Sequence, residues 1–261
     1  MSIRHHTSSH VVLGSCCFVS LRVASVTLAS PPSFSFSLSL SLSLRVFVSF
    51  FEEMTSSVSS KIRLVTFDFL GTLAGLRSKV TVGHFYASEA KKVGFDAGLR
   101  HVGGLNSAFL SAFREISLKH PNFGAQEGLD SYQWWRQVVV NTVINSELVL
   151  PSPELEQQQA EKKEYQVQRL DMLAKNLYQL FSGRACYQCF PETKMVLQNL
   201  QSRHVKLGVI SNSDERLHNV LKELGLGDYF SFTVTSKEVK AEKPMKEIFC
   251  KALEFAGVHR E

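Results

Sequence analysis

Hydrophobic and polar positions from residue 62 onward follow two patterns, which predict alternating strands and helices. Continuous apolar runs of strand length occur at 62–69 (IRLVTFDF), 205–212 (VKLGVISN) and, more briefly, 232–236 (FTVTS). Such runs are typical of strands that are buried on both faces of a parallel sheet. Most of the segments between them carry apolar residues at three- and four-residue spacing, which is typical of amphipathic helices. The order predicts an α/β fold with a Rossmann-like parallel sheet core.

A long helical block separates the first predicted strand from the second. Stretches such as LNSAFLSAFREISLKH and SYQWWRQVVVNTVI have helical spacing, and PSPELEQQQAEKKE is either an exposed helix or a loop. We expect residues 79–188 to form an inserted α-helical cap domain over the strand ends. Residues 61–78, with the first strand, and residues 189–261 then form the core.

Residues 1–53 differ from the rest of the chain in composition. No Asp or Glu occurs before Glu52, and residues 33–44 alternate Ser with an apolar residue. Alternation suits a strand, but one this uniform would slip in register, and it has no obvious partner. We expect a disordered low-complexity leader, either an organelle transit peptide or a translated upstream region followed by a start at Met54. The first origin places the protein in a chloroplast or mitochondrion, and the second in the cytoplasm or nucleus.

The net charge and the number of cysteines indicate which kinds of partner this protein binds. A net charge of +5 with scattered basic residues disfavours nucleic-acid binding. We expect no membrane partner, because the alternating serines of the leader leave no long apolar run. Five cysteines imply no disulfide framework, and CYQC at 186–189 lacks the second pair that a zinc site needs. A small-molecule substrate is the expected partner.

Candidate reactive side chains gather where the predicted strands end. Asp68 closes the first strand, and Ser211 and Asn212 close the second. The carboxyl ends of parallel strands meet at the edge of the sheet where such folds bind ligands. Asp68 could attack a phosphoryl group or an electrophilic carbon and hold it covalently. Ser211 and Asn212 could donate hydrogen bonds to substrate oxygens.

Three further residues complete the candidate site. Gly71 permits a tight turn beside Asp68, and Thr72 offers a hydroxyl group and a backbone N–H. Lys243, which precedes Pro244 at the start of the last helix, supplies a positive charge. That charge would stabilise both the ionised Asp68 and the negative charge that develops on a transferred group.

These motifs, in this order, resemble those of the haloacid dehalogenase-like hydrolase superfamily. The resemblance covers roughly residues 63–256, and the stretch HPNFGAQEGLDSYQWW is similar to the subgroup of haloacid dehalogenase-like hydrolase domain-containing protein 3. It implies a hydrolase that uses Asp68 as nucleophile on a small phosphorylated or otherwise activated metabolite. It also implies Mg²⁺, bound by Asp68 and the backbone carbonyl of Leu70. The alternative is a non-catalytic member, or a fragment, that binds a ligand or partner through the cap.

The chain departs from the superfamily pattern in three places. Leu70 stands where phosphatase members have a second Asp that protonates the leaving group, and such assistance is worth about 10²–10⁴-fold in rate. Met245 and Lys246 replace the usual Asp-Pro, so the last helix lacks an N-cap side chain. The fourth motif, a strand ending in Gly-Asp, is not reached before Glu261. We therefore expect a truncated chain with an incomplete Mg²⁺ site, little Mg²⁺-dependent turnover and an open sheet edge beside the Asp68 strand.

Overall fold

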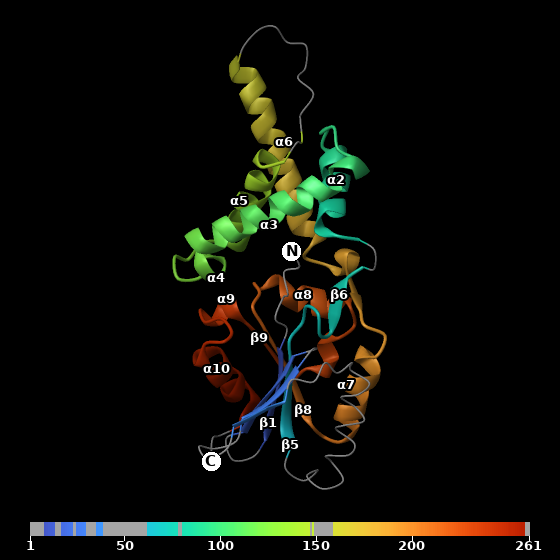
Figure 1. Cartoon of the computed structure of the whole chain (residues 1–261), viewed down its shortest axis with the longest axis vertical. Helices are drawn as coiled ribbons and strands as arrows, with labels where there is room; N and C mark the ends of the chain where they lie inside the picture. The colour runs from blue at the N-terminus through green and yellow to red at the C-terminus, as the bar shows by residue number, and fades with distance from the viewer. Residues whose placement is uncertain are drawn as a thin grey trace. The chain divides into compact units, whose positions relative to one another are not determined.

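The chain is organised as two compact units, Met1–Gly75 with Tyr187–Glu261, and Leu76–Cys186, each described here by itself (Figure 1). The computed structural model describes residues 62–77, 80–146, 148 and 159–258, together with four strand segments between residues 8 and 38. Among these residues, no helix is both long and apolar enough to cross a membrane. The limits predicted for the helical insertion, 79–188, lie close to those of the second unit.

The first unit, here called the core unit, contains the predicted parallel sheet. Its three parallel strands are β5 (Ile62–Phe67), β8 (Lys206–Ser211) and β9 (Phe232–Thr235), adjacent in that order. Two short strands, β6 (Ala74–Leu76) and β7 (Tyr187–Cys189), form a separate two-stranded sheet. The α/β fold class is therefore confirmed. The helices of the core unit are α7 (Thr193–Ser202), α8 (Arg216–Glu223), α9 (Ser236–Val239) and α10 (Lys246–Ala256), with the 3-10 turn η3 (Gly227–Tyr229).

Helices cover both faces of the parallel strands, which explains their continuous apolar sequences. Successive strand residues point to opposite faces. Val65 and Phe67 of β5 therefore pack in one cluster with α7 and α8, whereas Leu64 packs with α10. Figure 1 shows α7 and α10 on opposite sides of the sheet. As expected from its sequence, α10 begins after Met245 without a side-chain cap.

The edge of β5 away from β8 is paired, which corrects the expectation of an open edge. Strand β1 (Ser8–Leu13) runs antiparallel to β5 there, and the antiparallel sheet continues through β2 (Cys17–Arg22), β3 (Ser25–Ala29) and β4 (Ser35–Leu38). Strand β4 pairs with β3 within the segment expected to be a low-complexity leader, and the expectation that this leader is disordered stays a prediction. The physical reason for the pairing at β5 is that its unpaired backbone groups accept any compatible extended segment. The origin of the leader stays a prediction.

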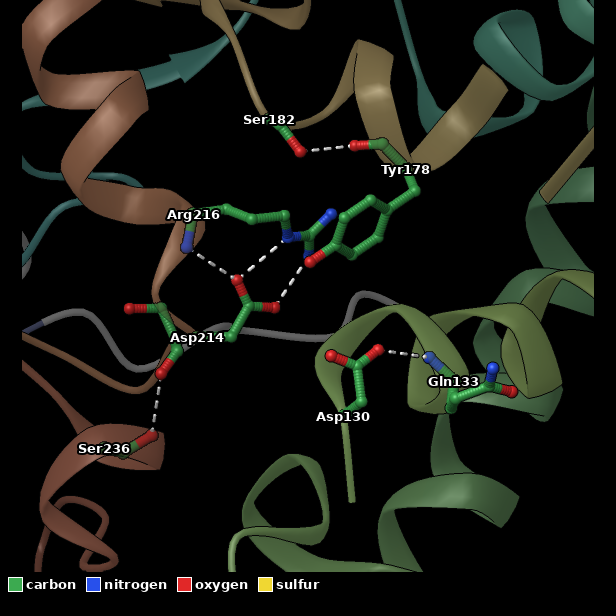
Figure 2. A network of polar contacts seen from close by, with 8 residues as sticks. Asp130, Gln133, Tyr178, Ser182, Asp214, Arg216 and Ser236 are labelled. Carbon is green, nitrogen blue, oxygen red and sulfur yellow. Dashed lines mark hydrogen bonds and ion pairs between the residues drawn. The ribbon is translucent and has the colours of Figure 1, made fainter. Parts of the chain in front are cut away.

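The second unit, here called the helical unit, confirms the helical pattern of its sequence. The segment PSPELEQQQAEKKE (151–164) is predicted to be either an exposed helix or a loop. Residues 159–164 form the first part of a helix, and residues 151–158 lie outside the described residues. Asp130 caps the N-terminus of helix α5 (Ser131–Ile144), where its side chain accepts a hydrogen bond from the backbone N–H of Gln133 (Figure 2). The elements are α2 (Val82–Lys92), η1 (Leu99–His101), α3 (Val102–Lys119), α4 (Pro121–Gly124), α5 (Ser131–Ile144), α6 (Gln159–Leu180) and η2 (Arg184–Cys186).

Two features hold the helices of this unit together. Helix α2 approaches α3 so closely at Gly83 that a Cβ there would lie 2.4 Å from the carbonyl oxygen of Val102. Trp134 is 1% exposed, packs against Phe113 and Phe123, and donates its indole N–H to the His120 carbonyl. Both Gly83 and Trp134 therefore serve the packing of the helices.

Candidate active site

Asp68 follows the last residue of β5, the first of the three parallel strands, so this strand delivers its carboxylate to the carboxyl edge of the sheet. Its Oδ1 atom accepts two hydrogen bonds, from the Phe69 backbone N–H at 2.8 Å and from the Lys243 Nζ at 2.9 Å. Among the described residues, its Oδ2 atom has no hydrogen-bond partner. The side chain is 11% exposed. The carboxylate is thus held through one oxygen and left free at the other.

Lys243 is the cation paired with Asp68. Its ammonium group also donates to the Ile210 carbonyl at 2.8 Å, and its side chain is 12% exposed. Burial lowers the pKa of Lys243 below its ordinary value, and the neighbouring Asp68 carboxylate partly opposes that shift. The motif residues from the first strand and from the last helix, 175 positions apart, are therefore brought together.

Asn212 contacts the main chain of Lys243, and its predicted contact with a substrate stays a prediction. Its side-chain Nδ2 donates to the Lys243 carbonyl at 3.0 Å, and its Oδ1 accepts from the Lys243 backbone N–H at 2.7 Å. The amide therefore fixes the main chain of Lys243 through one donated and one accepted hydrogen bond. Ser211, at the end of β8, is buried. Its hydroxyl stays a candidate substrate donor.

The loop after Asp68 is a tight turn, as predicted. Gly71 has a φ of +82°, a left-handed conformation that strains other residues, and its N–H donates to the Ala74 carbonyl at 2.8 Å. The backbone N–H of Thr72 donates to Phe69, so it is engaged within the loop rather than free for a substrate. The Thr72 hydroxyl is buried and has no partner among the described residues. Leu70, in contrast, is 41% exposed.

The structure adds an ion pair that the sequence motifs do not indicate. Asp214 accepts a hydrogen bond from the backbone N–H of Arg216 at 3.1 Å and also holds the Arg216 guanidinium group through both carboxylate oxygens, each at 2.8 Å (Figure 2). Ser236 of α9 donates to the Ser213 carbonyl beside it. The only available signal was the Asp-Glu-Arg spacing after β8, which does not distinguish a cap from a buried pair.

The CxxC cysteines have the properties of structural thiols. Among the described residues, Cys186 and Cys189 form no disulfide. Burial raises the pKa of Cys186 to about 12 and also raises the pKa of Cys189. Because the thiolate is the reactive form, neither cysteine has the lowered pKa of a redox or nucleophilic site.

A parallel sheet with an Asp–Lys pair at the carboxyl end of one of its strands places the protein in the class of α/β folds that bind ligands at that edge. Residues 62–261 match the family model for haloacid dehalogenase-like hydrolases. The chain belongs to this family, in the subgroup of haloacid dehalogenase-like hydrolase domain-containing protein 3.

Several proteins are similar to this chain over most of their length. Haloacid dehalogenase-like hydrolase domain-containing protein 3 from Danio rerio is 34% identical to this chain. The matched region covers 76% of this chain and 73% of the Danio rerio protein. The rhythmically expressed gene 2 protein of Drosophila melanogaster is 30% identical over 76% of this chain and 71% of its own. Among solved structures, a 2-haloacid dehalogenase from Pseudomonas syringae has 22% identity and a TM-score of 0.44, covering 76% of this chain and 74% of its own.

Members of this family generally use Mg²⁺. The described residues contain no group of three or more His, Cys, Asp or Glu side chains that could hold a metal ion. The oxygens that fit are the free Oδ2 of Asp68 and the backbone carbonyl of Leu70. Mg²⁺ usually keeps several waters and is bound through one or two carboxylates together with substrate phosphate oxygens. The donor set therefore suits an ion held mainly by water and substrate, not a closed protein cage.

Proposed function

We propose that this protein is a hydrolase that uses Asp68 as a nucleophile on a small phosphorylated or otherwise activated metabolite. One observation supports the proposal most strongly. The Asp68 carboxylate is fixed through Oδ1 by Phe69 and Lys243, while Oδ2 has no partner among the described residues. A nucleophile needs this combination of fixed orientation and one available electron pair.

The positions of the charges support a role for Lys243 in the same step. Its Nζ lies 2.9 Å from Asp68, so its positive charge attracts the carboxylate and holds it in place before attack. The same charge stabilises the negative charge on the transferred group as the new bond forms. Asn212, through two hydrogen bonds to the Lys243 main chain, keeps this cation in place. Mg²⁺, when bound at Asp68 and Leu70, would neutralise charge on phosphoryl oxygens.

The second candidate is a family member that binds a ligand without turning it over. It is favoured by one observation, the absence of a three-residue metal-binding group among the described residues. Such a protein would bind phosphate or a phosphorylated metabolite through the Lys243 cation, and it would form no covalent adduct.

Hydrolysis by matched variants tests the proposal. The full chain is assayed with Mg²⁺ on acetyl phosphate, p-nitrophenyl phosphate, glycerol phosphate and 2-chloropropionate. Turnover of at least one compound is expected, and D68N should reduce it to background. Asp228, an exposed Asp of the core unit, provides the control variant D228N, which removes a carboxylate away from the site. Equal activity of D68N and D228N would refute the assignment of Asp68.

A further inference from the structure

The surroundings of Asp68 determine which leaving groups the proposed reaction could expel. Leu70, two residues after Asp68, is 41% exposed and has no proton to donate. The Thr72 hydroxyl is buried, and a hydroxyl is a poor acid. Asp214 is ion-paired with Arg216 through both of its oxygens, which makes it an acceptor only. In the described part of the core unit, Lys243 is thus the one side chain with an ionisable proton that is bonded to Asp68.

The position of Lys243 prevents it from assisting the leaving group. In phosphoryl transfer, the attacking and leaving oxygens lie roughly in line on opposite sides of phosphorus. Lys243 is bonded to the carboxylate that attacks, with its Nζ 2.9 Å from Asp68 Oδ1. Its ammonium group therefore lies on the nucleophile's side of the reacting phosphorus. It can stabilise the transferred group, but it does not reach the oxygen that leaves.

The two steps can then be written with their protons and electron pairs. Asp68 Oδ2 forms a bond to phosphorus while the bond to the leaving oxygen breaks. The leaving oxygen keeps the electron pair and departs as an anion. Water next attacks the phosphorus of the aspartyl phosphate and releases its proton to solvent. Inorganic phosphate leaves, and the Asp68 carboxylate is regenerated.

We infer that the site selects substrates whose leaving group departs as a stable anion, such as acyl or aryl phosphates, and discriminates against alkyl phosphates. The inference rests on the proposed function of Asp68. An alkoxide needs a proton as it leaves, and a positioned acid usually supplies about 10²–10⁴-fold in rate. A carboxylate or phenolate leaves without that help. Halide leaves unprotonated as well, so a 2-haloacid shares this leaving-group chemistry but reacts at carbon.

The test compares leaving groups on the full-length protein. kcat/KM is measured for acetyl phosphate, a series of substituted phenyl phosphates and glycerol phosphate, with 2-chloropropionate as the arm that detects reaction at carbon. We expect the value to fall as the leaving group becomes more basic, with glycerol phosphate about 10²–10⁴-fold below acetyl phosphate. Turnover of 2-chloropropionate alone would keep the leaving-group rule and assign the electrophile to carbon.

Two substitutions at Leu70 test the cause. L70D introduces an acid, and L70N matches its size without one. We expect L70D to exceed L70N about tenfold or more on glycerol phosphate, with little difference on acetyl phosphate. Equal values for both variants on glycerol phosphate would overturn the role assigned to Leu70.

The outcomes separate this inference from the proposed function. A flat dependence on the leaving group, with turnover that D68N abolishes, would overturn the inference and leave the proposed function standing. No Asp68-dependent turnover of any of these compounds by folded protein would overturn both.

Discussion

The Asp68–Lys243 pair offers a quantitative test that does not require a known substrate. The two side chains are 11% and 12% exposed, and their charged atoms lie 2.9 Å apart. At an effective dielectric constant of about 20, two unit charges at that distance attract by about 6 kcal/mol before desolvation is subtracted. Removing one partner of a buried pair typically costs about 3–5 kcal/mol, because the other charge stays buried alone.

The perturbation is a double-mutant cycle with D68N, K243M and the double variant. D68N keeps an oxygen that can accept from the Phe69 N–H, and K243M keeps most of the side-chain length without the charge. We expect each single variant to lower the free energy of unfolding by about 3–5 kcal/mol. The double variant should lose clearly less than the sum of the two, by roughly 3 kcal/mol, because it buries no unpaired charge.

The assay is urea unfolding followed by far-UV circular dichroism. Both tryptophans, Trp134 and Trp135, belong to the helical unit, so tryptophan fluorescence would not report on the core unit directly. D228N, which alters an exposed Asp of the core unit, should change stability by no more than about 0.5 kcal/mol. Single-variant effects that add within about 0.5 kcal/mol would refute a direct Asp68–Lys243 interaction.

Three further results are expected. Burial lowers the pKa of Lys243 in the folded protein below its ordinary value of 10.5. At pH values between that lowered pKa and 10.5, the unfolded chain therefore binds more protons than the folded chain. In that pH window the free energy of unfolding should increase as the pH rises, whereas activity should fall. K243M should abolish the increase in the free energy of unfolding. A difference in that free energy between wild type and K243M that does not change with pH would contradict this. T72V removes a buried hydroxyl without a partner, so chemical unfolding should show unchanged stability or a gain of up to about 1 kcal/mol, not a loss. G83A should destabilise the helical unit by about 1–3 kcal/mol in a thermal melt, because its Cβ meets the Val102 carbonyl, whereas G103A, with open space around it, should not.

The sequence predicts most of the fold because the parallel strands are buried on both faces. The run 62–69 is apolar up to Asp68 except at Arg63 and Thr66, and this pattern indicates both the strand and the position of the carboxylate at its end. The helices follow from apolar spacing in the same way. The pairing of β1 with β5 was not predictable, because pairing at a sheet edge depends on backbone groups that are the same for every sequence.

The candidate site was predictable in its members but not in all of their roles. Asp68 and Lys243 stand out by residue type and by their position relative to strands and helices. The bonds of Asn212 to the Lys243 main chain, and of Lys243 to the Ile210 carbonyl, involve backbone partners on segments distant in sequence. Residue types do not specify such partners. The sequence therefore contains no sign that the Asn212 amide holds the main chain of Lys243 in place.

The most direct measurement of the central claim is the mass of the Asp68 peptide after reaction. The full chain is mixed with acetyl phosphate, or separately with 2-chloropropionate, quenched in acid within one turnover, digested and mapped by tandem mass spectrometry. The account predicts a covalent adduct on the peptide that contains Asp68, localised to that residue, in wild type and D228N but not in D68N. An adduct on another residue, or turnover by wild-type protein with no adduct on Asp68 at any quench time, would contradict it.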